Sequence, residues 1–281
     1  MTAQVFDSRI CALGEGPLWH PLRKQLFWFD ILGKRLLTRE AGKARHWSFQ
    51  THVSAAGWLG RDALLIASEN GLFRFDLRDG AQRPVVALEA DQPETRSNDG
   101  RADPWGGFWI STMGKKAEPG LGAIYRYHRG EMRRLSAPMT IPNAICFAPD
   151  KSCAYFADTA DRRILRQPLA RDTGWPVGRA TPFVDLRAEG MNPDGAVIDA
   201  QGCLWNAQWG ASRVACYSPA GVFLRAVALP AAQVSCPAFG GGDLSTLFAT
   251  TGAKSARGRH AGQTFAVRPG VVGLPECRVI P

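Results

Sequence analysis

The sequence predicts an all-β fold, and within that class a six-bladed β-propeller. Three observations support this prediction: short apolar segments recur at a regular spacing, a second strand-like segment follows each, and turn-forming residues precede several of them. A period of roughly 40 to 50 residues is typical of propeller blades, which are four-stranded sheets packed around a central channel. A β-sandwich is the competing all-β class, but it does not predict so regular a long period.

Six short apolar segments mark the expected blades. In chain order they are FWFD (27–30), LLIAS (64–68), FWIST (108–112), YFADT (155–159), LWNAQ (204–208) and LFATT (247–251). Their second residues are separated by 37, 44, 47, 49 and 43 positions, so the spacing fits one segment in each blade.

A second strand-like stretch follows every marker segment in the same order. These stretches are KRLLTRE (34–40), GLFRFDL (71–77), GAIYRYH (122–128), RRILRQP (162–168), SRVACYS (212–218) and QTFAVRP (263–269). Turn residues such as DPWGG, PDKS, DAQG and GGGD precede several markers, as expected for tight hairpin connections. The repeating unit is therefore at least a pair of antiparallel strands.

Length and composition indicate one domain spanning residues 1–281. The chain is 45% hydrophobic, which is enough to bury a large core, and it has no run of about 18 apolar residues that could cross a membrane. The first residues, MTAQVFDSRI, lack the basic-then-apolar order of a secretory signal. We therefore expect a cytoplasmic protein with no membrane partner, and the sequence does not decide between a monomer and a dimer.

Charge and cysteine patterns exclude two further classes of protein. The net charge of +9 is dispersed along the chain and does not form the basic stripe needed to bind nucleic acid. The seven cysteines are scattered and show no CxxC spacing, which argues against a disulfide framework and against a zinc–thiolate site. We expect them to be reduced and mostly buried.

Polar residues recur upstream of four blade markers. The stretch LGEGPLW, for example, places one carboxylate between two glycines and ahead of an apolar strand. Counting back 11 to 13 positions reaches Glu15 before Trp28, Asn98 before Trp109, Asn143 before Phe156 and Asp194 before Trp205. The innermost strand of every blade lines the channel, so equivalent positions in different blades meet near the axis. The other two blades place Val53 or Ser54 and Cys236 or Pro237 at this level.

Two carboxylates held together in a channel repel each other unless a cation neutralises them. Glu15, Asn143 and Asp194 form a set of oxygen ligands suited to Ca²⁺, Mg²⁺ or Mn²⁺, and three ligands alone do not exclude Zn²⁺ or Fe²⁺. Three protein ligands also leave positions for water and substrate, as in catalytic metal sites. The sequence therefore predicts one divalent metal ion in the central channel.

The chain resembles the regucalcin and gluconolactonase family of six-bladed propeller lactonases over nearly its whole length. The matching stretches are LGEGPLW, RSNDGRADPWGGFWISTM, IPNAICFAPD with YFADT, NPDGAVIDAQGCLW and FGGGDLSTLFATT. The resemblance implies that Glu15, Asn143 and Asp194 bind the metal and that Arg96 and Asn98 contact a sugar lactone. It also implies hydrolysis of the lactone to the sugar acid, with the metal polarising the carbonyl and Asp194 accepting a proton from the attacking water.

One loop departs from the mammalian regucalcin pattern. After Thr112-Met113 that pattern has an acidic pair, whereas this chain has Gly114-Lys115-Lys116. We therefore hypothesise that Lys116, or Lys115, faces a substrate that bears a carboxylate, such as an aldaric or uronic acid lactone.

Alternatives remain at this stage. A metal-binding regulatory or interaction propeller without turnover is possible, because fold alone does not assign activity. No G-x-S-x-G elbow or phosphate-binding loop occurs, and the five histidines show no metal-helix spacing. We interpret the histidines as surface or packing residues. His52 differs from the others in lying beside the channel-facing position of the second blade.

Overall fold

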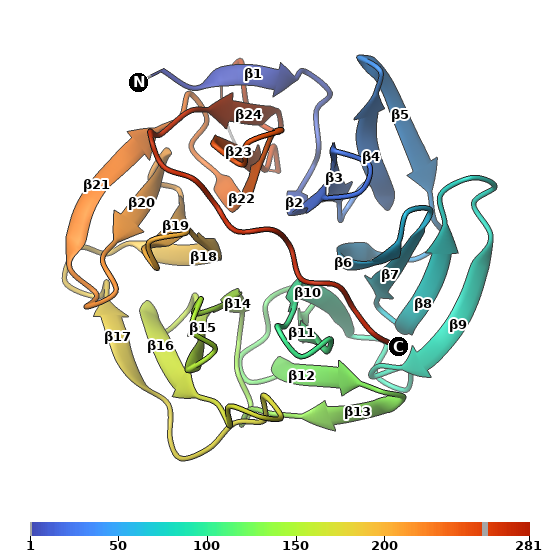
Figure 1. Ribbon diagram of the computed structural model, residues 1–281, viewed down its shortest axis with the longest axis horizontal. Coiled ribbons are helices and arrows are strands. Elements are labelled where there is room, and N and C mark those ends of the chain that lie inside the picture. The colour runs from blue at the N-terminus through green and yellow to red at the C-terminus, as the bar shows by residue number, and fades with distance from the viewer. Residues whose placement is uncertain (1, 255–257) are drawn as a thin grey trace.

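The computed structural model describes residues 2–254 and 258–281, and these residues form only β-strands, turns and loops. Six four-stranded sheets are arranged as blades around a central axis (Figure 1). The predicted six-bladed β-propeller is therefore confirmed. No helix in the described part of the chain has the length and apolarity to reach across a bilayer.

The first three blades follow one another along the chain, each running from the axis outwards. Blade 1 comprises β2 (Gly14–His20), β3 (Gln25–Asp30), β4 (Arg35–Glu40) and β5 (Lys43–Ser48). Blade 2 comprises β6 (Val53–Gly60), β7 (Ala63–Ser68), β8 (Gly71–Asp76) and β9 (Gln82–Ala87). Blade 3 comprises β10 (Thr95–Ala102), β11 (Phe108–Gly114), β12 (Ala123–His128) and β13 (Glu131–Arg134).

The last three blades repeat this arrangement, and the sixth takes its outer strand from the other end of the chain. Blade 4 comprises β14 (Pro142–Phe147), β15 (Cys153–Asp158), β16 (Arg163–Pro168) and β17 (Thr181–Asp185). Blade 5 comprises β18 (Asn192–Ile198), β19 (Leu204–Trp209), β20 (Arg213–Tyr217) and β21 (Phe223–Ala228). Blade 6 comprises β22 (Val234–Gly240), β23 (Thr246–Thr251), β24 (Thr264–Val267) and β1 (Gln4–Asp7).

The six apolar markers found in the sequence are the second strands of the blades. They are almost wholly buried; β3 and β7, for example, have no exposed residue, whereas the outermost strand β5 is mostly exposed or half-buried. The difference follows from position, because neighbouring blades cover both faces of a second strand and solvent reaches the outer one. Trp109 and Trp205 lie in this buried layer, as core residues and not as a surface for a sugar.

The hydrophobic core is divided among the spaces between blades. Each of six buried clusters joins two neighbouring blades; Phe27 and Phe29 of blade 1 pack with Leu64 and Ile66 of blade 2, for example. Burial of this kind stabilises a fold by about 25 cal/mol per Å² of apolar surface. Because the apolar faces of each blade pack against the neighbouring blades, the innermost strands can carry polar side chains at the axis.

The two ends of the chain meet in blade 6. β1 pairs antiparallel with β24, and β24 pairs with β23, so the N-terminal strand completes the sheet that the C-terminal part of the chain begins. This pairing closes the ring and leaves no blade incomplete.

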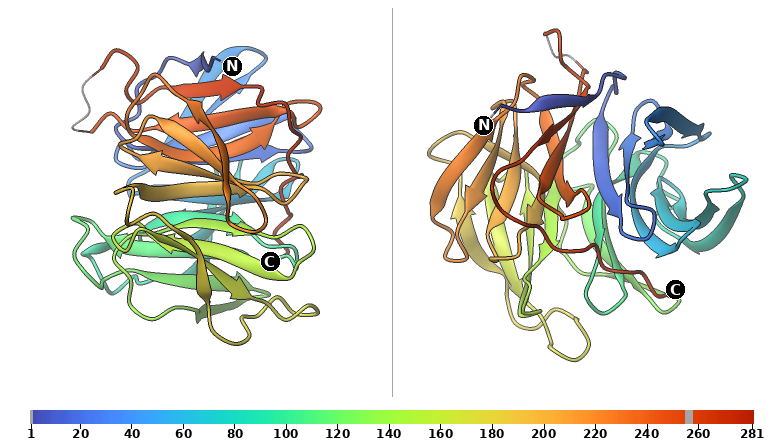
Figure 2. Two further views of the ribbon diagram at one scale, coloured as in Figure 1. Left: turned by 90° about the vertical axis from the view of Figure 1, so that its left-hand side faces the viewer. Right: turned by 45° about the horizontal axis from the view of Figure 1, so that its top comes forward.

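After β24 the chain crosses one face of the ring (Figures 1 and 2). This C-terminal tail, residues 268–281, lies over the C-terminal ends of the innermost strands. Gly273 bridges to Asp199 just after β18, and the Val279 amide donates to the Trp58 carbonyl in β6 at 3.0 Å. Val279 is fully buried. The tail therefore covers one end of the central channel.

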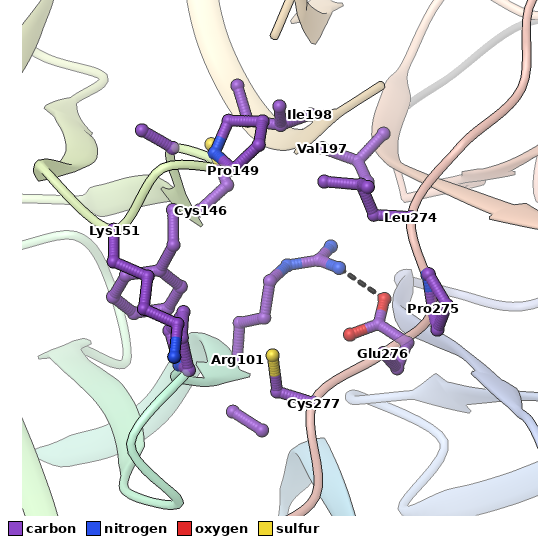
Figure 3. Close-up of a pocket in the computed structure, with 14 residues that line it drawn as sticks. Arg101, Cys146, Pro149, Lys151, Val197, Ile198, Leu274, Pro275, Glu276 and Cys277 are labelled. Carbon is purple, nitrogen blue, oxygen red and sulfur yellow. Dashed lines mark hydrogen bonds and ion pairs between the residues drawn. The ribbon is translucent and has the colours of Figure 1, made fainter. Parts of the chain in front are cut away.

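Beneath the tail, a buried ion pair joins Glu276 to Arg101 of β10 (Figure 3). Arg101 Nε and Nη2 also donate to the carbonyls of Ile145 and Ala196 at 3.3 and 3.2 Å. A mostly apolar cavity of 380 Å³ lies beside this pair, between the tail and blades 3, 4 and 5. Arg101 thus connects the tail to three blades.

Removing the Glu276 carboxylate should destabilise the propeller, because the buried Arg101 guanidinium then has no anionic partner. We expect Glu276→Ala to lower the free energy of unfolding in urea by about 3 kcal/mol. The control is Glu131→Ala, which breaks an exposed pair with Arg133 and should cost less than about 1 kcal/mol. Equal losses in the two variants would contradict this account of the tail.

Candidate functional site

The four polar residues that the repeat register singled out all lie in innermost strands. Glu15 is in β2, Asn98 in β10, Asn143 in β14 and Asp194 in β18, each near the N-terminal end of its strand. The tail crosses the other ends of these strands. The candidate site and the tail therefore occupy opposite ends of the channel.

A β-bulge interrupts every innermost strand at this level. In four strands the pairing with the second strand shifts between Glu15 and Leu18, Ser97 and Gly100, Asn143 and Cys146, and Pro193 and Ala196. Glu15 and Asn143 are the last paired residues before their bulges, whereas Asn98 and Asp194 lie within theirs. This difference explains the sequence offsets of 13 and 11 positions from the markers. Bulges redirect side chains, and here they redirect four of them at one level of the channel.

The residues after Glu15 and Asn143 share an unusual backbone conformation. Gly16 has φ of 50° and the buried Ala144 has φ of 59°, both in the left-handed region. A non-glycine residue held there is strained by roughly 1 kcal/mol or more. The same left-handed turn at two equivalent positions, strained at Ala144 and unstrained at Gly16, indicates that the turn itself is needed to direct the two side chains.

Close packing explains the two glycines around Glu15. A Cβ atom at Gly14 would lie 2.6 Å from the Thr251 carbonyl oxygen of blade 6, and one at Gly16 would lie 2.2 Å from the Ser54 carbonyl oxygen of blade 2. No side chain fits at either distance. The GEG sequence therefore brings Glu15 to the axis while its backbone touches both neighbouring blades.

A chain of hydrogen bonds connects blades 3, 4 and 5 at the site. Arg96 Nη1 donates to Asn98 Oδ1 at 2.9 Å, and Asn98 Nδ2 donates to Asn143 Oδ1 at 3.0 Å. Asn143 Nδ2 in turn donates to Thr159 Oγ1 at 2.9 Å, and Thr159 Oγ1 donates to the Pro193 carbonyl, next to Asp194, at 2.7 Å. The structure thus brings together Arg96, Asn98 and Asn143 by direct contact and links them to the strand of Asp194.

Buried carboxyl groups interact electrostatically across the axis. Burial, together with the charge of Asp99, raises the pKa of Glu15 to about 8, and the amide of Gly16, which donates to Glu15 Oε2 at 2.9 Å, opposes this. Burial also raises the pKa of Asp194, with contributions from Glu15 and Asp99. Glu15 and Asp194 therefore lie close enough to destabilise each other's charge.

Asp99 is a third buried acid that sequence reasoning missed. Its Oδ2 accepts the Ile145 amide of β14 at 2.8 Å, so this oxygen binds the neighbouring blade, and burial raises the pKa of its carboxyl group. Asp99 lies within the quoted stretch SNDGRAD, directly after Asn98 and inside the same bulge. Its place directly after Asn98 is the sequence signal that could have identified it.

Arg96 is the cation nearest to this acidic group. Burial lowers the pKa of its guanidinium to about 10, and the charges of Glu15, Asp194 and Glu69 act in the opposite direction. Arg96 Nε is buried without a hydrogen-bond partner in the described chain. Arg96 thus interacts with the buried carboxyl groups of Glu15 and Asp194, whereas Arg101 acts on Asp99, so one cation beside two buried acids leaves the site able to accept further positive charge.

The remaining blades contribute few oxygen atoms at this level. Ser54 Oγ of blade 2 donates to Ser97 Oγ at 2.8 Å, and Cys236 of blade 6 is a buried free thiol. All seven cysteines are free and six are buried, as expected.

The two lysines that follow β11 make different contacts. Lys115 Nζ forms an ion pair with Glu69 Oε2 at 2.8 Å, and His52 Nδ1 lies 2.7 Å from the same oxygen. Lys116 is exposed, and its backbone amide donates to Glu118 Oε2 at 3.1 Å. Lys115 therefore has an acidic partner, whereas Lys116 forms no ion pair within the described residues.

A second group of potential metal ligands lies away from the axis. The ligand atoms of Asp199, Cys203 and Cys216 lie within 4.8 Å of one another. However, Asp199 Oδ1 accepts the amides of Gln201 and Cys203, both at 2.9 Å, and its Oδ2 accepts the Trp205 indole at 2.9 Å. Because both oxygens are used in the β18–β19 turn, we interpret this group as structural.

Comparison with known proteins places this site in a family context. Residues 13–253 match the family model described as the SMP-30/Gluconolactonase/LRE-like region. L-arabinolactonase from Azospirillum brasilense is 35% identical over 277 residues, covering 95% of this chain and 91% of the relative. The 6-deoxy-6-sulfogluconolactonase of Pseudomonas putida is 31% identical, covering 94% of each chain.

A solved structure agrees over the whole chain. The crystal structure of a calcium-binding protein, regucalcin, from Agrobacterium tumefaciens strain C58 superposes with a TM-score of 0.97 at 37% identity, covering 100% of this chain and 98% of the other. These matches confirm the resemblance found in the sequence. The chain belongs to the SMP-30/gluconolactonase/LRE-like family of six-bladed β-propellers.

Proposed function

We propose that this protein hydrolyses a sugar lactone to the open-chain sugar acid. The observation that carries the proposal is the group of buried acid, amide and arginine side chains at the end of the channel opposite the tail. Its relatives in Azospirillum brasilense and Pseudomonas putida are named as lactonases, which supports the same reaction class here.

Glu15, Asn143 and Asp194 are the residues that would hold one divalent metal ion. The donor set fits such an ion: burial raises the pKa of both carboxyl groups, Glu15 raises that of Asp194 further, and the Asn143 amide oxygen lies in the hydrogen-bonded chain that reaches the strand of Asp194. Asn143 Oδ1 accepts one hydrogen bond, from Asn98, and its second lone pair is therefore available to a metal ion. All three donors are oxygen, which suits Ca²⁺, Mg²⁺ or Mn²⁺ and permits Zn²⁺ or Fe²⁺.

When bound, such an ion would supply Lewis acidity to the lactone carbonyl. Asp194 accepts a proton from the water that attacks the carbonyl carbon, and the raised pKa of its carboxyl group suits it to this role. The ring C–O bond then breaks, and the proton passes to the departing ring oxygen. Arg96 and Asn98, already hydrogen-bonded to each other, orient the hydroxyl groups of the sugar.

The first test is hydrolysis itself. The wild-type protein with added metal should open sugar lactones well above the spontaneous rate in a pH-indicator assay, and a chelator should abolish this. Asp194→Asn should lower kcat by at least about 100-fold, the scale of a general base. Calorimetry on the same variant separates loss of metal from loss of the base.

Metal binding without turnover on any lactone of the panel would favour a regulatory or interaction propeller instead. Absence of both binding and turnover would reject the proposal altogether.

Stability should depend on pH in the metal-free protein. Because the pKa of Glu15 is raised to about 8, the stability that its protonated form contributes is present at low pH and is lost as the pH rises through about 8. We therefore expect the Tm in EDTA to fall between pH 5 and pH 9, and less steeply in Glu15→Gln.

Saturating metal should reverse this trend, because it binds the charged carboxylates. At a fixed concentration of 100 times the Kd measured at pH 8.5, the metal stabilises the folded protein by about 2.7 kcal/mol at that pH, or roughly 5 °C in Tm, and the same concentration should stabilise it less at pH 5.5. A metal-induced shift that is the same at both pH values would argue against Glu15 and Asp194 as ligands.

Lys116 is the candidate to contact an acidic substrate. The 1,4-lactones of gluconic and glucaric acid differ only at one terminus, which is CH₂OH in the first and a carboxylate in the second. The ratio of their kcat/KM values therefore reports a contact between Lys116 and the carboxylate. Lys116→Ala should lower the preference for glucarolactone roughly fivefold, which corresponds to an exposed ion pair of about 1 kcal/mol. An unchanged ratio would remove Lys116 from the site.

A further inference from the structure

Three ionisable side chains, His52, Glu69 and Lys115, form a connected cluster next to Arg96, and the mechanism above uses none of them. Glu69 Oε2 lies 2.7 Å from His52 Nδ1 and 2.8 Å from Lys115 Nζ. Lys115 Nζ also donates to the Pro93 carbonyl at 2.8 Å. The cluster spans blades 2 and 3.

The ends of the strands place this cluster at the same end of the channel as the acidic site. His52 directly precedes β6, Glu69 directly follows β7, and Lys115 directly follows β11. Val53 pairs with Ser68 and Arg96 with Met113, so these strand ends lie at the level of Arg96.

His52 occupies in blade 2 the position that Arg96 occupies in blade 3. Val53 and Ser97 are the last paired residues before the bulges of β6 and β10, and His52 and Arg96 each come one residue earlier. Because side chains alternate along a strand, the two residues point to corresponding sides of their blades. The cluster therefore extends the wall that begins with Arg96.

The cluster is accessible, unlike the acidic site. The side chains of Lys115, His52 and Glu69 are 34%, 19% and 12% exposed. Burial alone would raise the pKa of Glu69, but hydrogen bonds from His52 and Lys115 hold it below its usual value. Glu69 is therefore a carboxylate that a small ligand can reach.

The cluster retains hydrogen-bonding capacity. Glu69 Oε1 has no hydrogen bond within the described residues, although a carboxylate oxygen can accept two. The Lys115 ammonium has three donors, and its charge is matched by Glu69. Such a surface accepts and donates hydrogen bonds to hydroxyl groups, but Glu69 repels a carboxylate placed beside it.

We infer that His52, Glu69 and Lys115 form a specificity wall that binds the hydroxyl groups of the lactone's exocyclic chain and disfavours a carboxylate there. This inference rests on the proposed lactonase function and names the substrate class of that site: lactones with a neutral hydroxylated chain. Lys116 acts in the opposite direction from the neighbouring loop, so the balance between Glu69 and Lys116 sets the tolerance for acidic lactones.

The test measures kcat/KM for glucono-1,4-lactone and glucaro-1,4-lactone in variants of the full chain with metal added. Glu69→Gln removes the repelling charge and frees the Lys115 ammonium, so the ratio of glucarolactone to gluconolactone should rise about tenfold, mainly through KM. Adding Lys115→Met to Glu69→Gln should return the ratio to near the wild-type value. Lys115→Met alone, which leaves Glu69 without its cation, should lower the ratio about threefold.

The matched control is Glu40→Gln. Glu40 also forms ion pairs with arginines, at 2.7 Å to Arg23 and 3.0 Å to Arg45, but it lies on β4, away from the innermost strands. The control changes the net charge by the same amount as Glu69→Gln and should leave the ratio within about twofold, since distant exposed charges are screened. Calorimetry should find the same metal affinity in Glu69→Gln as in the wild type, which separates substrate selection from damage to the acidic site.

Several outcomes would overturn the inference. The inference fails if the ratio of kcat/KM for glucarolactone to that for gluconolactone in Glu69→Gln stays within twofold of the wild-type ratio. It also fails if Glu40→Gln changes this ratio as much as Glu69→Gln does. If Glu69→Gln does not fold, an unchanged kcat/KM ratio in Lys115→Met would also overturn the inference. A wild type that hydrolyses neither lactone nor any other sugar lactone would instead overturn the proposed function and the inference with it.

Discussion

Mutual repulsion of buried carboxyl groups at the axis is the constraint on which this structure depends. Glu15, Asp99 and Asp194 come from three different blades, and burial raises the pKa of all three. Asp99 further raises the pKa of Glu15, and Glu15 and Asp99 raise that of Asp194, while Arg96 lowers the pKa of Glu15 and Asp194. A fold does not hold like charges together unless its backbone leaves them no other position. The bulges, the left-handed residues Gly16 and Ala144, and the close contact of Gly14 with blade 6 supply that restraint.

The restraint is possible because the propeller separates stability from the site. Its apolar clusters lie between blades, so the innermost strands are fixed from the side and need no apolar residue at the axis. The C-terminal tail closes the opposite end of the channel through Val279 and the Arg101–Glu276 pair. The proposed lactonase function therefore requires the substrate to approach the acidic group from the opposite end, where Arg96 and the specificity wall lie.

The sequence predicted the fold and the four polar positions because both depend on the repeat. Spacing identifies equivalent places in different blades, and the radial arrangement then brings them together. Asp99 escaped detection because a bulge changes which residue of Asn98-Asp99 faces inward, and periodicity assumes regular strands. The sequence singled out Lys115 as an alternative to Lys116, but Glu69 escaped because its contact with Lys115 joins two strand ends from different blades. The tail escaped because it belongs to no repeat.

The inferred division between hub and wall would also account for relatives named for different sugar lactones. The acidic and amide residues lie in bulges of innermost strands, where a substitution would disturb both the strand pairing and the neighbouring blades. His52, Glu69 and Lys115 lie just outside β6, β7 and β11, where a change alters hydrogen bonding to a ligand without altering a strand. Selection for a new substrate therefore acts most easily on the wall, while the chemistry of the hub stays fixed.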